Sequence, residues 1–269
     1  RILLSLDDMN LSREAWIRPL QRPTPPLTLP PMRDDVRRIA RREWEDRAAA
    51  EYVGVMIVRR LHGLLVDLNA PMDLQALTLV MMVQEQEHTN MCMAAAQSLG
   101  SDGKISFDLM ELQQARSNLP IEEQLLRMLA TTFMVGEVTA FALLAHGVRA
   151  LPPSGFRDIM REILRDEAGH ARIGQTVLRV LREQQQTTWA RYPGDETIAV
   201  RVEEAQANLR RRDVVEAETV TLHEDPEASA QLMLLGIPPS TTFRQAYLTA
   251  IEADVATAMR QVTGSTETR

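Results

Sequence analysis

The chain contains the same short pattern, Glu-x-x-His, twice. Glu85 precedes His88 by three residues, and Glu167 precedes His170 by the same interval. On an α-helix, residues three apart lie about 60° apart around the axis and about one turn apart along it, so the Glu and the His reach toward the same point. Carboxylates and imidazoles that converge in this way are typical ligands of a metal ion.

Two more glutamates stand alone in apolar sequence. Glu137 is the only formal charge between Arg127 and Arg149, and Glu51 lies in the similarly apolar stretch RAAAEYVGVMIVRR. Burying an isolated carboxylate is so costly that the group normally takes up a proton. Neither glutamate has a cationic partner within its apolar stretch, so we expect each to meet a cation that is bound elsewhere in the fold.

The lone glutamates and the pairs form a repeat. Glu51 lies 34 residues before Glu85, and Glu137 lies 30 residues before Glu167. With a rise of about 1.5 Å per residue, these positions are roughly level when consecutive helices run antiparallel. Four Glu and two His at one level in a helical core make a two-metal site, and oxygen and imidazole ligands without sulfur suit iron or manganese, with zinc as a further option. The predicted ligands are Glu51, Glu85, His88, Glu137, Glu167 and His170.

The elements that must position these residues are helices. Only 12 Gly are spread along the chain and no segment alternates like a strand, so the sequence predicts an all-α fold. Four long helices are expected, followed by shorter ones near the C-terminus. Their expected ranges are about 34–67, 73–99, 121–151 and 155–186, with a charged helix at 195–222, a break at 223–226 and a last helix from about 240. A short helix is also expected at 107–116.

The Pro-rich residues 18–32 cannot form a helix and are expected to form an extended arm over the domain or over a neighbouring subunit. We therefore divide the chain into three parts. Residues 1–32 form the arm, residues 33–188 form a four-helix bundle with the metal site, and residues 189–269 form additional helices that pack on the bundle.

The amino-acid composition limits the kinds of partner and the cellular location that we expect for the protein. The chain of 269 residues has 45% hydrophobic residues and a net charge of -7, which argues against nucleic acid or an anionic membrane as the main partner. Cys92 is the single cysteine, so an internal disulfide and a thiolate metal site are excluded. No uninterrupted apolar run approaches the roughly 18 residues of a membrane span, and no signal peptide is recognisable. We expect a cytoplasmic protein.

With these motifs, the chain resembles the ferritin-like superfamily of di-iron carboxylate proteins. That group includes ribonucleotide reductase small subunits, bacterial multicomponent monooxygenases, aldehyde-deformylating oxygenases and bacterioferritins. The resemblance covers roughly residues 34–186 and implies a ferritin-like four-helix bundle in which the six residues named above bind two iron ions. It also implies that Asp166 is an outer partner that accepts a proton from a ligand histidine, with His88 as the expected target.

At several positions the chain differs from the pattern of individual families in this superfamily, which makes some of these families less suitable as a comparison. Cys92 occupies the place of the radical Tyr of reductase small subunits, which counts against a radical-storing subunit, and we interpret it as a small buried residue. Ile163 stands where arylamine N-oxygenases carry an extra His. His62, His146 and His223 are not expected to be ligands, and Glu87 is expected to face away from the cluster. Ferritins are shorter, and the additional C-terminal residues here are expected to cover a substrate pocket.

The resemblance implies a non-haem di-iron oxygenase or oxidase that uses O2 on a small organic substrate. Hydroxylation, N-oxygenation, desaturation and C–C cleavage all stay open. The expected partners are an external electron donor, either ferredoxin or a flavin reductase, and a second copy of the chain in a homodimer. The alternatives are a ferritin-like ferroxidase, a manganese catalase-like enzyme, and a plain bundle with buried salt bridges. The residues expected to line the substrate pocket are Met81, Cys92, Phe133, Thr139 and Phe141.

Overall fold

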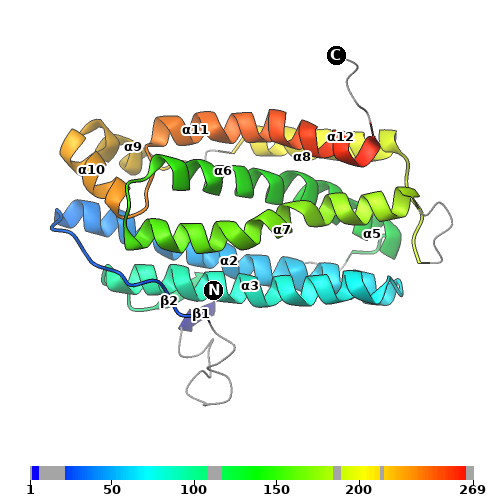
Figure 1. Ribbon diagram of the computed structural model, residues 1–269, viewed down its shortest axis with the longest axis horizontal. Coiled ribbons are helices and arrows are strands. Elements are labelled where there is room, and N and C mark those ends of the chain that lie inside the picture. The colour runs from blue at the N-terminus through cyan, green and yellow to red at the C-terminus, as the bar shows by residue number, and fades with distance from the viewer. Residues whose placement is uncertain (1, 6–21, 108–116, 184–188, 213–214, 265–269) are drawn as a thin grey trace.

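The computed structural model describes residues 2–5, 22–107, 117–183, 189–212 and 215–264. The regular secondary structure of the described part is helical apart from two short strands, and the long helices lie side by side along one axis (Figure 1). This confirms the prediction of an all-α protein at the level of fold class.

The first two long helices, α2 (Asp34–Asp67) and α3 (Met72–Ser98), pack against each other along their lengths. Asp34 and Asp35 lie in the first turn of α2, where negative charge complements the helix dipole. Asn69 adopts a left-handed conformation with φ of 54° in the turn between the helices, and Pro71 precedes α3. Both helices agree with their predicted ranges to within one residue.

The second pair contains a feature that the sequence analysis did not predict. The helical run from Ile121 to Ala150 is continuous, but it consists of α5 (Ile121–Met128), the π-helix η2 (Leu129–Gly136) and α6 (Glu137–Ala150). The wider turns of a π-helix occur mostly as short insertions, frequently at functional sites. After Pro152 and Pro153, α7 (Gly155–Glu183) packs back against η2 and α6.

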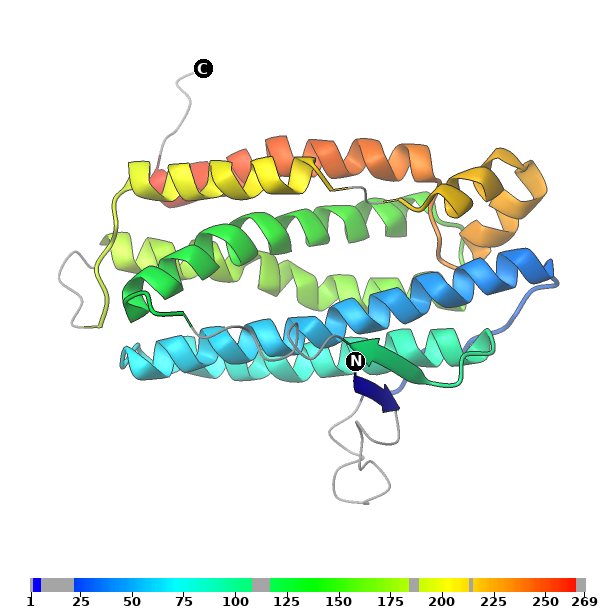
Figure 2. The ribbon, with the colours of Figure 1, turned by 180° about the vertical axis from the view of Figure 1, so that it is seen from behind.

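The C-terminal helices form a further layer against α6 and α7 (Figures 1 and 2). The prediction of one helix over 195–222 is wrong, because α8 (Asp195–Arg210) ends before a separate α9 (Ala217–Glu224). Asp225 then caps α10 (Pro226–Leu234) by accepting hydrogen bonds from two backbone amides. The last helical run comprises α11 (Ser240–Thr249), η3 (Ala250–Asp254) and α12 (Val255–Thr263).

The described residues of the N-terminal arm lie over the same chain. Residues 22–32 are not helical, and the side chains of Leu27, Leu29 and Met32 pack against buried residues of the bundle. Further upstream, β1 (Ile2–Ser5) pairs antiparallel with β2 (Lys104–Phe107), a two-stranded sheet that the sequence analysis did not predict. Phe107 therefore ends a strand instead of starting the expected short helix, and residues 108–116 lie outside the described residues.

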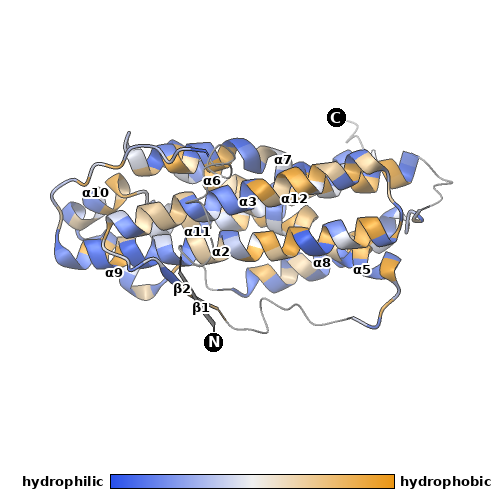
Figure 3. Cartoon of the chain, turned by 90° about the horizontal axis from the view of Figure 1, so that it is seen from below, coloured by the Kyte–Doolittle hydropathy of each residue, from blue (hydrophilic) through white to orange (hydrophobic). Residues whose placement is uncertain are grey.

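The buried apolar residues form two clusters along the long helices. One cluster includes Trp44, Met91 and Phe156, and the other includes Leu61, Met81 and Phe133. Hydrophilic and hydrophobic residues alternate in short runs along the helices (Figure 3), as expected of helices that bury one face. Along α2, α3 and α7, the predicted ligands fall between the residues of one cluster and those of the other. The polar group thus lies at the junction of two apolar cores.

By length and composition alone, the run Ile121–Ala150 is apolar enough to cross a membrane, and core helices of soluble proteins have the same profile. Glu137 lies in the middle of this run.

The close packing of α7 on η2 can be tested with two glycines of α7. A Cβ on Gly174 would lie 2.9 Å from Cβ of Phe133, whereas a Cβ on Gly169 would meet nothing within 4 Å. We expect Gly174→Ala to lower the free energy of unfolding by about 1–3 kcal/mol because the helices must separate. Gly169→Ala is the matched control and should leave stability unchanged or raise it by up to about 1 kcal/mol.

Chemical denaturation of the metal-free protein measures both variants. If Gly174→Ala unfolds at the same denaturant concentration as Gly169→Ala, the tight contact between α7 and η2 is not present in solution.

Candidate metal centre

The six predicted ligands come together in the middle of the long helices. Their ligand atoms form two overlapping groups, and within each group the atoms lie within 4.8 Å of one another. The first group comprises Glu51, Glu85, His88 and Glu167, and the second comprises Glu85, Glu137 and His170. Glu85 belongs to both. This cluster of carboxylates and imidazoles can therefore hold a metal ion.

Both histidines turn the same ring nitrogen toward the cluster. Nδ1 of His88 lies 3.3 Å from a carboxylate oxygen of Glu51 and 3.3 Å from one of Glu167. Nδ1 of His170 lies 3.2 Å from an oxygen of Glu85 and 3.2 Å from one of Glu167. Glu167 thus lies between the two imidazoles, whose ring centroids are 5.7 Å apart.

The opposite ring nitrogens are held by polar side chains outside the cluster. Nε2 of His88 lies 3.1 Å from Oδ2 of Asp166, the partner expected from the resemblance. Nε2 of His170 lies 3.0 Å from Oε1 of Gln84, a residue that the sequence analysis did not identify. Such outer contacts fix the orientation of a ligand imidazole and leave Nδ1 free to bind a metal.

The arm reaches the same network. Arg22 forms an ion pair with Asp166 and a second one with Glu87, whose Oε2 lies 2.5 Å from Nε of Arg22. Glu87 belongs to neither ligand group, and its ion pair with Arg22 anchors the arm. No sequence pattern links Arg22 to these carboxylates, because Arg22 and Asp166 are 144 positions apart in the chain.

Gly54 provides the space for the shared carboxylate. It lies one turn after Glu51 on α2, and a Cβ at this position would come within 2.5 Å of Oε2 of Glu85. Such a distance is far shorter than a van der Waals contact, so Glu85 can occupy its position only beside a glycine. Sequence reasoning missed this residue because a glycine within an apolar helix is not specific to a site.

The π-helix η2 ends directly before Glu137. Because a π-turn contains more residues than an α-turn, η2 changes the direction in which the following side chains leave the helix. The π-helical turns therefore set the direction of the Glu137 carboxylate relative to the other helices.

The electrostatics of the metal-free cluster are dominated by burial and by contacts between its members. Burial opposes the charge on His88, but hydrogen bonds to Asp166, Glu167 and Glu51 outweigh it and raise the pKa of His88 to about 12. For His170, the carboxylates of Glu167 and Glu85, each 3.2 Å from Nδ1, likewise outweigh burial and raise the pKa to about 10. For Glu137, burial and the nearby carboxylates raise the pKa well above its ordinary value. Without a metal, bound protons thus supply the charge that the carboxylates require.

One atom in particular fits a metal ion. Nδ1 of His170 is buried and makes no hydrogen bond of suitable geometry, although two carboxylate oxygens lie near it. A buried polar atom that lacks a well-aligned hydrogen bond is costly. A cation between Nδ1 and the carboxylates would bind all of them, so the residues present fit a metal ion.

A cavity of about 420 Å³ borders the cluster. Four of the ligand residues contribute to its wall, and most of the remaining lining is apolar, including Leu143, Met160 and Ile163. Cavities of this size and character are typical of small-molecule sites.

The five residues expected to line a substrate pocket are distributed differently in the structure. Cys92 lines the cavity beside the ligands. Met81 and Phe133 are buried in one of the apolar clusters, and Thr139 is also buried. Phe141 lines a second cavity. The cavity beside the ligands is bounded mainly by α2, α6 and α7, so it lies on other helix faces than the sequence analysis assumed.

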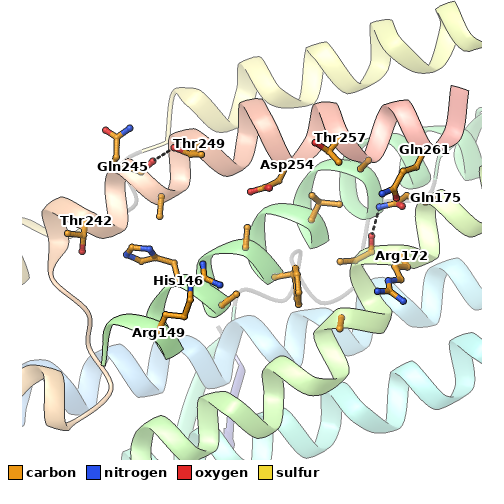
Figure 4. Close-up of a pocket in the computed structure, with 18 residues that line it drawn as sticks. His146, Arg149, Arg172, Gln175, Thr242, Gln245, Thr249, Asp254, Thr257 and Gln261 are labelled. Carbon is orange, nitrogen blue, oxygen red and sulfur yellow. Dashed lines mark hydrogen bonds between the residues drawn. The ribbon is translucent and has the colours of Figure 1, made fainter. Parts of the chain in front are cut away.

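The second cavity, of about 690 Å³, lies between α6 and α7 on one side and the C-terminal helices on the other (Figure 4). His146 and Arg149 of α6 and Thr242 and Gln245 of α11 are among the residues that line it. No residue of the two ligand groups lines this cavity.

The remaining histidines lie outside the two ligand groups. Nδ1 of His62 is 2.9 Å from the hydroxyl of Thr78, and Nδ1 of His223 is 3.0 Å from the hydroxyl of Ser229. His146 lines the second cavity.

Comparisons of the chain with models of protein families, with curated proteins and with solved structures found no match. The functional argument therefore rests on the geometry and chemistry of the cluster.

The role of Gly54 leads to a test on metal affinity. We expect Gly54→Ala to displace the Glu85 carboxylate and to lower the affinity for Zn²⁺ by about 10–100-fold, a range seen when a contact that orients a ligand is lost. Gly63→Ala on the same helix is the matched control, because a Cβ there meets nothing within 4 Å. Competition with a chromophoric chelator measures both affinities. Equal affinities for the two variants would contradict the role assigned to Gly54.

The raised pKa values predict that metal uptake depends on pH. Because the pKa values of His88 and His170 are about 12 and 10, both imidazoles carry a proton at neutral pH and must lose it when Nδ1 binds a metal. Burial also raises the pKa of Glu85 to about 7, which adds a proton below that pH. Zn²⁺ affinity should therefore rise from pH 6 to pH 8.

Calorimetry in buffers of different ionisation enthalpy measures the protons released on zinc binding. A zinc affinity that is constant over this pH range, with no proton release, would contradict the charge state described here.

Proposed function

We propose that the protein is a non-haem di-iron oxygenase or oxidase that uses O2 to oxidise a small organic substrate. The observation that carries this proposal is the combination of two overlapping ligand groups, which share Glu85, with an apolar cavity that borders them directly. A metal cluster that only stabilised the bundle would need no such cavity.

The number and type of metal ions follow from charge and donor chemistry. Four carboxylates carry four negative charges, which two divalent cations neutralise. Oxygen and imidazole donors without sulfur favour iron or manganese, and the absence of any sulfur atom from the two groups argues against copper(I). Bound iron would supply the reaction with O2, and manganese would fit the same donors.

The residues of the chain hold this centre and control access to it. His88 and His170 would bind through Nδ1, because Asp166 and Gln84 occupy their other nitrogens. The apolar wall formed by residues such as Leu143 and Ile163 limits water near the ligands. Pro238 and Phe243, from the C-terminal part of the chain, close the cavity on the side away from α3.

The same proposal includes the type of helical bundle, the partners and the location of the protein. A ferritin-like four-helix bundle would be formed by α2, α3, the run containing α6, and α7, with the C-terminal helices covering a substrate cavity that an iron store does not need. The external electron donor, either ferredoxin or a flavin reductase, the homodimer and the cytoplasmic location expected from the sequence belong to this proposal as well.

Anaerobic loading with Fe²⁺ tests the metal centre. We expect two iron ions per chain, and exposure to O2 should produce a transient visible absorption band. Glu137→Ala and His170→Ala should each reduce iron affinity by more than about 10–100-fold, since removing a ligand should cost at least as much as removing an outer partner.

His146→Ala and Glu162→Ala are the controls, because neither residue belongs to a ligand group. Binding of no more than one metal ion by the parent, or unchanged iron affinity in Glu137→Ala and His170→Ala, would refute the di-iron assignment.

A further inference from the structure

Arg47 brings a positive charge to the cavity that borders the metal cluster. It lies one turn before Glu51 on α2 and lines the same cavity as Glu51, Glu85 and Glu137. The other charged residues that line this cavity are the four glutamate ligands, and most of the rest of the wall is apolar. The position and charge of Arg47 therefore need an explanation.

The guanidinium has few partners among the described residues. Nη2 donates a hydrogen bond of 3.2 Å to the carbonyl of Gly236, and the guanidinium carbon lies 4.8 Å from the centre of the Trp44 ring. No carboxylate of the described chain lies within ion-pair distance of Arg47, and the carboxylate of Glu51 is directed to His88. An Arg side chain has five N–H donors, so most of the Arg47 donors have no hydrogen-bond partner among the described residues.

Cys92 does not balance this charge. Its side chain lines the same cavity, but burial raises the pKa of the Cys92 thiol well above its ordinary value, so the thiol stays neutral. If two divalent cations neutralise the four glutamates, the guanidinium has no ion-pair partner among the described residues. Glu43, one turn earlier on α2, interacts with it only at longer range. Leaving such a group partly buried is costly, and a bound anion would offset that cost.

We propose that the cavity binds a small carboxylic acid with an apolar body, and that Arg47 pairs with its carboxylate. This inference rests on the proposed function, because it names the class of substrate that the same site accepts. The planar guanidinium matches a carboxylate with two parallel hydrogen bonds. The apolar body of the acid lies against Leu143, Leu144 and Ile163, which line the cavity between α6 and α7.

The geometry also sets which part of the acid meets the metal ligands. Arg47 and Glu51 are four residues apart on α2, which corresponds to about 6 Å along the helix axis. In the proposed binding mode, the carboxylate lies on Arg47 and the chain of the acid extends along the cavity toward the glutamates. The carbon atoms that reach the ligands are separated from the carboxylate by several bonds.

A purely structural role for Arg47 predicts a different outcome. The loop that contains Gly236 is already attached to α2, because Nε1 of Trp44 donates a hydrogen bond of 2.8 Å to the carbonyl of Leu235. If Arg47 only held this loop, its replacement would change stability without changing the preference between charged and neutral ligands. The charge preference of the cavity is therefore the decisive measurement.

Calorimetry on the zinc-loaded protein with octanoate and 1-octanol measures this preference. The two probes share the same alkyl chain length and differ in charge. We expect the parent to bind octanoate at least tenfold more tightly than 1-octanol. Arg47→Met should abolish the preference, while Arg59→Met, an exposed arginine on the same helix with no ion pair among the described residues, should keep it.

Arg47→Lys provides a second variant if Arg47→Met does not fold. It keeps the positive charge but loses the planar fork, so the preference for octanoate should fall at least threefold. The inference is overturned if the parent binds both probes equally or neither of them, if Arg47→Met retains the preference, or if Arg47→Lys shows no decrease.

Zinc content separates this inference from the proposed function. A parent protein that fails to bind two metal ions refutes the proposed function itself. A parent that binds two zinc ions but shows no preference for octanoate refutes only the role of Arg47.

Discussion

Four glutamates gathered in the interior of a helical protein are costly to bury, and the rest of the structure has to offset that cost. Glu85 and Glu167 are almost completely buried, and they lie with Glu51 and Glu137 around two buried histidines. Carboxylates this close repel each other and lose their hydration, so they persist only with compensating positive charge. Protons on the imidazoles supply that charge in the metal-free chain, and a metal ion would supply it more completely.

Much of the surrounding structure serves this group of charges. Asp166 and Gln84 orient the two imidazoles from outside, Gly54 leaves room for the Glu85 carboxylate, and η2 directs Glu137. The two apolar clusters on either side keep the helices together although their middle is polar. The packing of the two apolar clusters thus offsets the free-energy cost of burying the polar centre.

The parts outside the four long helices act on the centre and on its cavity. The arm contributes Arg22, which pairs with the carboxylate that holds His88. In the C-terminal part, the loop after α10 accepts hydrogen bonds from Trp44 and Arg47. Residues that follow this loop line the cavity. These additions give the cluster a defined apolar space beside it, and this space is the main reason to favour an oxygenase over an iron store.

The sequence by itself determined which glutamates and histidines gather in the cluster and which four helices carry them. The spacing of Glu85 and His88 is a local property of a helix, and Glu137 is conspicuous because its own helix offers no partner. Proline and asparagine at the turns marked the ends of α2 and the start of α3 for the same local reason. Only the tertiary structure decided what depends on contacts between distant segments: the pairing of β1 with β2, the π-turns of η2, the separation of α8 from α9, and the positions of Arg22, Gly54 and Gln84. The cavity also lies on other helix faces than expected, because helix rotation is set by how side chains of different helices pack together, and periodicity within one helix does not contain that information.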